Sequence, residues 1–499
     1  MSIYYLFPGL HGIDSWYHIG LIQEILKFGY LPGNELYSSL PVMHLGITIF
    51  KLLTGMGLKD SFFIVSVIEI IITLFIFIIS SKIFNVEIGL LSTLILNMSD
   101  QYILWGVDLT PMTLGAAFFI ILLYLIISKT NIPNKSNASI SLLLILILFI
   151  NTLTHVISNL VCVIALSIAF IVEYFVRSFN NHVENRSYYA VSINLAISSI
   201  LLTISYWIYA DKGLGYYPNY FDEALASLIY ATRTVNIGNI NLVTQVSQLD
   251  QYNIAINHIG YLIIIFLLIF GISNLISLNK LNNLNLEFLL VLIGAIFIII
   301  YPSALIGLNA LLPQRWFLFL YILIVIISAF GMSYLTHALG DHSAYKLAFI
   351  SSFIFILIFS MITNSTTNSD SPIYPGNNIE NSSYSRTWFF ESEMVVGNFA
   401  SQKIGSIHAV SDTLYTLDLF NKWYLDNNIS PFLASDLDSF DKGLVIIRTD
   451  VLNGRVIAKS TNYMYIYINP PQKFLDYFGK TNVSLIYNNK KVAIYANRI

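Results

Sequence analysis

The sequence predicts a polytopic α-helical membrane protein with a small C-terminal α/β domain. Of its 499 residues 56% are hydrophobic and only 11% are charged, whereas soluble domains carry about 25% charged residues. The mean hydropathy is +0.70, and the apolar residues fall in runs of roughly 18 or more, which is long enough to span a bilayer. This composition excludes a soluble multidomain enzyme and a disordered or fibrous chain.

About ten apolar runs are long enough to be membrane-spanning helices. They cover residues 61–84, 86–105, 112–128, 140–156, 157–176, 190–210, 258–278, 286–306, 316–335 and 346–363. One further apolar stretch, residues 41–56, is only about 15 residues long, so we expect a re-entrant or surface-lying helix there. The sequence therefore predicts 10–11 apolar helices at the membrane.

Basic residues in the short loops predict the orientation of these helices. They fall at alternate connections, which we place in the cytoplasm: Lys82, Lys129, Lys135, Arg177, Arg186, Lys280 and Lys346. The opposite short connections contain only Arg315. Residues 6–59, the loop 211–257 and everything after Asn364 are therefore expected outside the cell membrane.

Three parts are expected along the chain. Residues 1–60 would form a first outer loop with interfacial helices, 61–364 a transmembrane helical domain, and 365–499 a soluble extracytoplasmic α/β domain. Residues 1–10 are apolar but too short to span a bilayer, so either the chain starts at the membrane surface or a preceding span is missing from this reading frame.

The composition changes after about Asn364, where Ser, Asn, Asp and Tyr become more frequent. Here we predict helices over residues 386–404 and 415–427. β-Branched and aromatic residues predict strands at Leu444–Arg448, Tyr463–Asn469, Val483–Tyr487 and Val492–Tyr495, the last two joined as a hairpin by a turn containing Asn. About 130 residues are enough to form a core of their own.

The net charge excludes a nucleic-acid-binding protein, and the cysteine content excludes a protein built on disulfides or cysteine-bound metals. A formal charge of −3 gives no basic surface for nucleic acid. The single cysteine, Cys162, lies inside an apolar run. One thiol permits neither a disulfide framework nor a cysteine-based metal site within one chain.

The segment from Pro8 to Gly29 carries the strongest chemical signal. Asp14 can cap a helix that runs to Gly29. When this helix is projected at 100° per residue, its other polar side chains gather on one face and its aliphatic side chains on the other, as in an interfacial helix. Asp14 and His18 lie one turn apart on the apolar face, where polar groups need partners. The alternative is a simple cap at Asp14 with His18 filling an interfacial position.

Four more polar residues are expected on the same side of the membrane. Asp108 lies in a short turn between two spans, His44 in the 41–56 stretch, His155 at the end of a span, and Arg315 at the mouth of another. The guanidinium fork of Arg315 suits a phosphate. Each also has a structural alternative, namely a turn residue, a satisfied interfacial histidine, or an anchor in the membrane interface.

One stretch resembles the first outer loop of the GT-C superfamily glycosyltransferases: Asp14-Ser-Trp-Tyr-His18 followed by Leu21-Ile22, Ile25-Leu26 and Gly29. It is most similar to the catalytic subunit of archaeal oligosaccharyltransferase and to related protein mannosyltransferases. The sequence match covers residues 8–60, and the architecture matches over the whole chain. In that superfamily the first outer loop carries an essential acidic residue, and the sugar comes from a polyprenyl phosphate or pyrophosphate.

The resemblance implies transfer of a sugar from a polyprenyl-phosphate-linked donor to a glycan, lipid or protein acceptor on the outer face. Asp14 would be the general base of an inverting reaction, His18 matches a histidine common four residues on, and Asp108 falls at a second acidic position. Arg315, with His155 or His44, would bind the donor phosphate. Mg²⁺ or Mn²⁺ bridging Asp14 and Asp108 and a metal-free site both stay open. The Trp-Trp-Asp motif of oligosaccharyltransferases is absent, so peptide N-glycosylation is not expected.

Two other functions remain as alternatives. A transporter or lipid flippase would use the carboxylates of Glu69 and Asp100, which lie inside predicted spans. It would also show two similar halves, which the sequence lacks. A non-catalytic surface protein is the third alternative. Convergence of Asp14, Asp108 and Arg315 in one outward cavity would favour the enzyme, and their dispersal would favour the surface protein.

Overall fold

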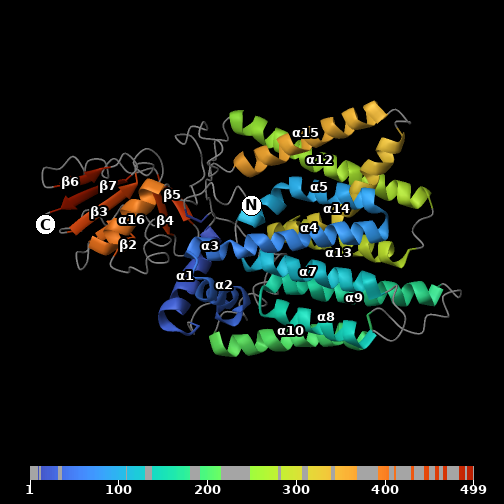
Figure 1. Ribbon diagram of the computed structural model, residues 1–499, viewed down its shortest axis with the longest axis horizontal. Helices are drawn as coiled ribbons and strands as arrows, with labels where there is room; N and C mark the ends of the chain where they lie inside the picture. The colour runs from blue at the N-terminus through green and yellow to red at the C-terminus, as the bar shows by residue number, and fades with distance from the viewer. Residues whose placement is uncertain are drawn as a thin grey trace.

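Long helices pack side by side in a bundle, and a small sheet lies beyond one end of it in the computed structural model (Figure 1). Three short helices at the N-terminal side of the chain lie between the two parts. The structure describes residues 9–10, 13–31, 36–107, 110–129, 137–179, 191–214, 248–278, 283–305, 313–338, 343–367, 391–403, 409–411, 429–431, 443–448, 456–459, 465–468, 483–488 and 492–497.

All ten predicted apolar runs form helices. The helices up to the sheet are α1 (Ile13–Phe28), α2 (Val42–Thr54), α3 (Leu58–Phe62), α4 (Ile64–Ile83), α5 (Val86–Met98), α6 (Asp100–Val107), α7 (Pro111–Lys129), α8 (Asn137–Thr152), α9 (Val156–Phe179), α10 (Ile193–Leu214), α12 (Gln248–Ser277), α13 (Leu284–Leu305), α14 (Pro313–Ala338) and α15 (Ser343–Thr367). A 3₁₀ turn, Leu36–Ser39, precedes α2.

Six of the described helices are long and apolar enough to cross a membrane. They are Leu58–Ile83, Pro111–Lys129, Val156–Val176, Ile259–Ser277, Leu284–Tyr301 and Arg315–Ala338. The other predicted runs correspond to shorter apolar helices. The chain is therefore a mostly helical protein with candidate membrane spans.

Two predicted helices differ in detail from the structure. The run 86–105 is divided, because Ser99 adopts an extended conformation with ψ of 126° between α5 and α6. The Asp100 side chain accepts a hydrogen bond of 2.7 Å from the Gln101 N–H at the start of α6. In the 41–56 stretch, α2 ends at Gly55, whose φ of 69° only glycine adopts readily. At 13 residues, α2 is about 20 Å long, too short to cross a bilayer.

Close backbone contact joins α12 to α14. A Cβ added to Gly331 would lie 2.3 Å from the Leu267 carbonyl oxygen, and one added to Gly271 would lie 2.6 Å from the Ile327 carbonyl oxygen. Small residues at such crossings let helix backbones approach, as they commonly do in membrane proteins. These two glycines therefore set the spacing of this helix pair.

The C-terminal strands form a five-stranded mixed sheet in the order β2-β1-β3-β7-β6. Its strands are β1 (Ala409–Ser411), β2 (Ile429–Pro431), β3 (Gly443–Arg448), β6 (Val483–Asn488) and β7 (Val492–Asn497), and a separate pair joins β4 (Val456–Lys459) to β5 (Tyr465–Ile468). β1 is parallel to β2 and β3, whereas β7 is antiparallel to β3 and β6. The predicted strands and the pairing of the hairpin are confirmed.

One helix of the C-terminal part is described, α16 (Glu391–Lys403), which confirms most of the predicted helix 386–404. The predicted helix 415–427 and the turn between β6 and β7 lie outside the described residues. The division of the chain at residues 60 and 364 remains a prediction.

A hydrophobic cluster ties the first helices to the C-terminal sheet. It includes Trp16 of α1, Phe62 of α3, Val396 of α16 and Ile446 of β3, all almost completely buried. The Trp16 ring lies against Gly9, where an added Cβ would come within 2.8 Å of it. This packing fixes α1, and with it Asp14, at the end of the bundle that faces the sheet (Figure 1).

The glycine contacts of α12 and α14 lead to a stability prediction. We expect Gly331→Ala to lower the melting temperature in detergent by several degrees, because overpacking costs about 1–3 kcal/mol. Gly294→Ala in α13 is the matched control, because an added Cβ there meets nothing within 4 Å, and the helical propensity of alanine should leave stability unchanged or higher. Equal melting temperatures for the two variants would contradict the packing account.

Candidate functional site

An ion pair joins the first helix to the start of α14. The Asp14 Oδ2 accepts a hydrogen bond of 3.0 Å from an Arg315 Nη, across 301 residues of sequence. The Asp14 side chain is 47% exposed and that of Arg315 is 26% exposed. The helix projection placed Asp14 on the buried face of α1, but the carboxylate in fact lies at its edge, because its partner comes from another helix.

Two histidines lie behind this ion pair. The His18 Nδ1 and the His44 Nε2 are 3.1 Å apart, and one donates a hydrogen bond to the other. Both side chains are almost fully buried, at 1% exposure. The ring of Tyr37 packs edge-on against His18 with centroids 4.5 Å apart, and it lies 5.8 Å from the His44 ring. α1 and α2 therefore share a buried aromatic and imidazole contact.

Arg315 lies beside both Asp14 and Tyr37. The pKa of Tyr37 is raised above its ordinary value, mainly because the side chain is buried. The Arg315 guanidinium, which lies within hydrogen-bonding reach, opposes this increase, whereas the negative charge of Asp14 adds to it. The Tyr37 hydroxyl consequently stays protonated near neutral pH and can donate a hydrogen bond. The charge of Arg315 also reaches His155.

His44 and His155 are neutral at physiological pH. Burial lowers the pKa of His44 to about 4. Burial and the nearby charge of Arg315 lower the pKa of His155 to about 3. The His155 Nδ1 accepts a hydrogen bond of 3.3 Å from the Ser158 N–H at the start of α9, which places the proton of the neutral ring on Nε2. These two residues can donate hydrogen bonds but carry no positive charge.

We call this group the Asp14 cluster: Asp14, His18, Tyr37, His44, His155 and Arg315. It brings together five of the six predicted site residues, from α1, α2, α14 and the turn before α9. The sixth, Asp108, lies outside the described residues. Tyr37 was missed, because a tyrosine in a short 3₁₀ turn has no distinguishing sequence pattern.

Metal binding was expected to depend on Asp14 and Asp108. Among the residues that the structure describes, no three His, Cys, Asp or Glu side chains are grouped as metal ligands. Because Asp108 lies outside them, a bridging Mg²⁺ or Mn²⁺ ion stays a prediction.

The carboxylates proposed for a transporter take part in helix packing. Asp100 is 3% exposed and accepts a hydrogen bond from the Tyr261 hydroxyl. The Glu69 carboxylate lies against Gly106 of α6, where an added Cβ would come within 2.0 Å of it. Each carboxylate thus lies at a contact between two helices.

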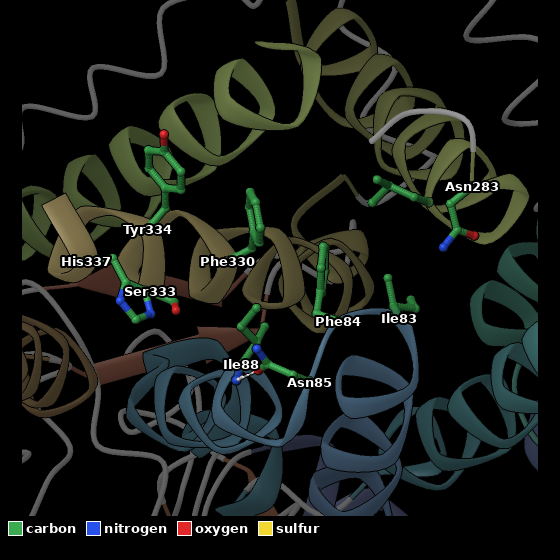
Figure 2. Close-up of a pocket in the computed structure, with 10 residues that line it drawn as sticks. Ile83, Phe84, Asn85, Ile88, Asn283, Phe330, Ser333, Tyr334 and His337 are labelled. Atoms are coloured by element: carbon green, nitrogen blue, oxygen red, sulfur yellow. Dashed lines mark hydrogen bonds between the residues drawn. The ribbon is translucent and has the colours of Figure 1, made fainter. Parts of the chain in front are cut away.

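A cavity of about 360 Å³ lies between the ends of α4, α5, α13 and α14 (Figure 2). Its wall includes Phe84, Ser333, Tyr334 and His337. His337 lies 22 residues after Arg315 on α14, which corresponds to about 33 Å along the helix. The cavity is therefore separate from the Asp14 cluster.

The depressed pKa of His44 leads to a pH prediction. In the unfolded chain this histidine takes up a proton below about pH 6.5, whereas in the folded protein it does so only near pH 4. Stability is therefore lost as the pH falls through this window, by on the order of 3 kcal/mol.

Melting temperatures measured in detergent between pH 7.5 and 4.5 check this prediction. We expect His44→Gln to reduce the loss on acidification, and His337→Gln, whose native side chain is 63% exposed, to leave it unchanged. The same acid sensitivity in His44→Gln and the native protein would contradict the assignment of a buried neutral imidazole.

Comparison with known proteins identifies the fold. No protein-family model matches the sequence, and no curated protein is similar to it by sequence. Among solved structures, ArnT from Cupriavidus metallidurans bound to undecaprenyl phosphate superposes with a TM-score of 0.53 at 10% identity, covering 98% of this chain and 94% of ArnT. The Archaeoglobus fulgidus oligosaccharyltransferase in the apo form superposes with a TM-score of 0.55 at 12% identity, covering 94% of this chain and 72% of that enzyme. This chain therefore shares the fold of these two structures, which is GT-C-like, over nearly its full length.

Proposed function

We propose that the protein transfers a sugar from a polyprenyl-phosphate-linked donor to an acceptor at the membrane surface. The observation that carries this proposal is the contact between Asp14 and Arg315, which places a carboxylate beside a cation at the end of a GT-C bundle. The ArnT structure of similar fold is bound to undecaprenyl phosphate. A lipid phosphate supplies the anion that a guanidinium at this position would bind.

The reaction needs one base and one phosphate-binding group. Asp14 accepts the proton of the acceptor hydroxyl as its oxygen attacks C1 of the sugar. The C1–O bond to the phosphate breaks, and its electron pair leaves with the phosphate, so a single attack inverts the anomeric centre. Arg315 stabilises the charge that develops on the leaving phosphate.

The remaining members of the Asp14 cluster act through hydrogen bonds. His155 and His44 are neutral, so they would donate N–H groups to the phosphate without adding positive charge. His18 would hold the His44 ring through their 3.1 Å hydrogen bond. Asp108 would supply the second acidic group near Asp14, with or without a divalent metal ion.

Removal of the Asp14 carboxylate tests the proposed base. In membranes supplied with a panel of labelled polyprenyl-phosphate sugars, we expect Asp14→Asn to reduce transfer by about 10²–10⁴-fold, the usual contribution of a general base. Glu24→Gln on the same helix is the matched control for loss of one negative charge and should retain transfer. Mass spectrometry of surface glycans and glycolipids with and without the chain identifies the product. Undiminished transfer by Asp14→Asn would refute this assignment.

The proposed orientation places the Asp14 cluster outside the cell. The chain has one cysteine, and it is completely buried, so an introduced cysteine can be labelled without background. We expect a membrane-impermeant maleimide to label Lys27→Cys in intact cells, and to label His337→Cys only after permeabilisation. The opposite labelling pattern would place the cluster in the cytoplasm and contradict transfer on the outer face.

A further inference from the structure

The contact between Asp14 and Arg315 occupies the groups that the proposed reaction requires. One Asp14 oxygen faces an Arg315 N–H at 3.0 Å, so that oxygen is not free to accept a proton from an acceptor hydroxyl. The guanidinium is likewise turned toward a carboxylate of this chain. In the structure, therefore, the proposed base and the proposed phosphate ligand bind each other.

This ion pair is suited to exchange. Both side chains are partly exposed, and exposed ion pairs contribute little to stability. A single oxygen–nitrogen contact joins them, although a guanidinium carries five N–H donors and binds phosphate through two parallel hydrogen bonds. A phosphate can accordingly offer Arg315 more hydrogen bonds than Asp14 does.

The surroundings would hold Arg315 in place when Asp14 leaves. Arg315 lies in the first turn of α14 and is followed by Trp316, which is 2% exposed. Its guanidinium lies beside Tyr37, whose ring is packed against the His18 and His44 rings. The N-terminus of α14 adds a favourable electrostatic field for an anion.

We propose that the donor phosphate displaces Asp14 from Arg315, with the Tyr37 hydroxyl donating a second hydrogen bond to it, so that Asp14 becomes free to act only when a lipid phosphate is bound. This inference rests on the proposed function. It makes Tyr37 a donor-binding residue, and it makes donor binding the step that prepares the base.

The exchange also accounts for how the product leaves. After transfer Asp14 holds the acceptor's proton and is uncharged, so it does not compete for Arg315 while the phosphate carries its extra negative charge. When Asp14 releases that proton to water, its carboxylate competes with the lipid phosphate for the guanidinium again. The ion pair seen in the structure is then restored as the lipid dissociates.

Binding of undecaprenyl phosphate to the purified protein in detergent tests the exchange. We expect Asp14→Asn to bind at least fivefold more tightly than the native protein, because the competing carboxylate is gone. Arg315→Gln should bind at least tenfold more weakly, and Tyr37→Phe about threefold more weakly. Glu24→Gln should bind as the native protein does, and melting temperatures verify that each variant is folded.

A double variant separates competition from simple charge repulsion. If Asp14 acts by occupying Arg315, its replacement should change affinity less than twofold in the Arg315→Gln background. A gain that persists in that background, or no gain in Asp14→Asn alone, would overturn the exchange. Inorganic phosphate at the same concentrations should not displace the lipid, and displacement by it would overturn the lipid phosphate as the ligand.

The transfer assay keeps this inference distinct from the proposed function. If Asp14→Asn is inactive but binds the lipid phosphate no more tightly than the native protein, the exchange is refuted and the assignment of Asp14 as the base is kept. If Asp14→Asn binds the lipid phosphate more tightly and still transfers sugar, the assignment of Asp14 as the base is refuted instead.

Discussion

Polar groups inside a mostly apolar protein must find partners, and this requirement shapes the whole chain. Removing a hydroxyl, amide or imidazole from water without a hydrogen bond is costly. The structure meets the requirement between helices, as where Asn159 bridges Thr152 and Thr203 with hydrogen bonds of 3.1 and 2.9 Å. It meets the requirement again where the His18 and His44 rings join α1 to α2.

The Asp14 cluster differs from these buried contacts in its exposure and charge. His44 and His155 are buried and neutral, whereas Asp14 and Arg315 are charged and partly exposed. Neutral donors that do not titrate near pH 7 can hold a ligand without changing the charge of the site. The one ion pair at the edge is then the part that an anionic substrate can rearrange.

Packing decides where this cluster lies. The Trp16 ring and its hydrophobic neighbours join α1 to the C-terminal sheet, while the glycine contacts of α12 and α14 hold two long helices close together. Arg315 lies in the first turn of α14 and donates a hydrogen bond to Asp14, so it lies at the end of the bundle where α1 is anchored. Apolar packing therefore positions the cluster within a fold that this chain shares with ArnT at 10% identity.

The sequence by itself determined the helical membrane fold, most strands and the residues of the cluster other than Tyr37. Long apolar runs and alternating β-branched residues are local signals, because helices and strands satisfy their backbone groups within or between nearby segments. Asp14, His18 and Arg315 were also recognisable from their residue types and neighbours.

Only the tertiary structure decided which residues touch. It paired Asp14 with a residue 301 positions away, placed β3 between β1 and β7, and added Tyr37 to the cluster. It also divided the run 86–105 at Ser99, beside the polar residues Asp100 and Gln101. Such contacts depend on how helices distant in sequence pack in three dimensions, and hydropathy and residue spacing do not specify that packing.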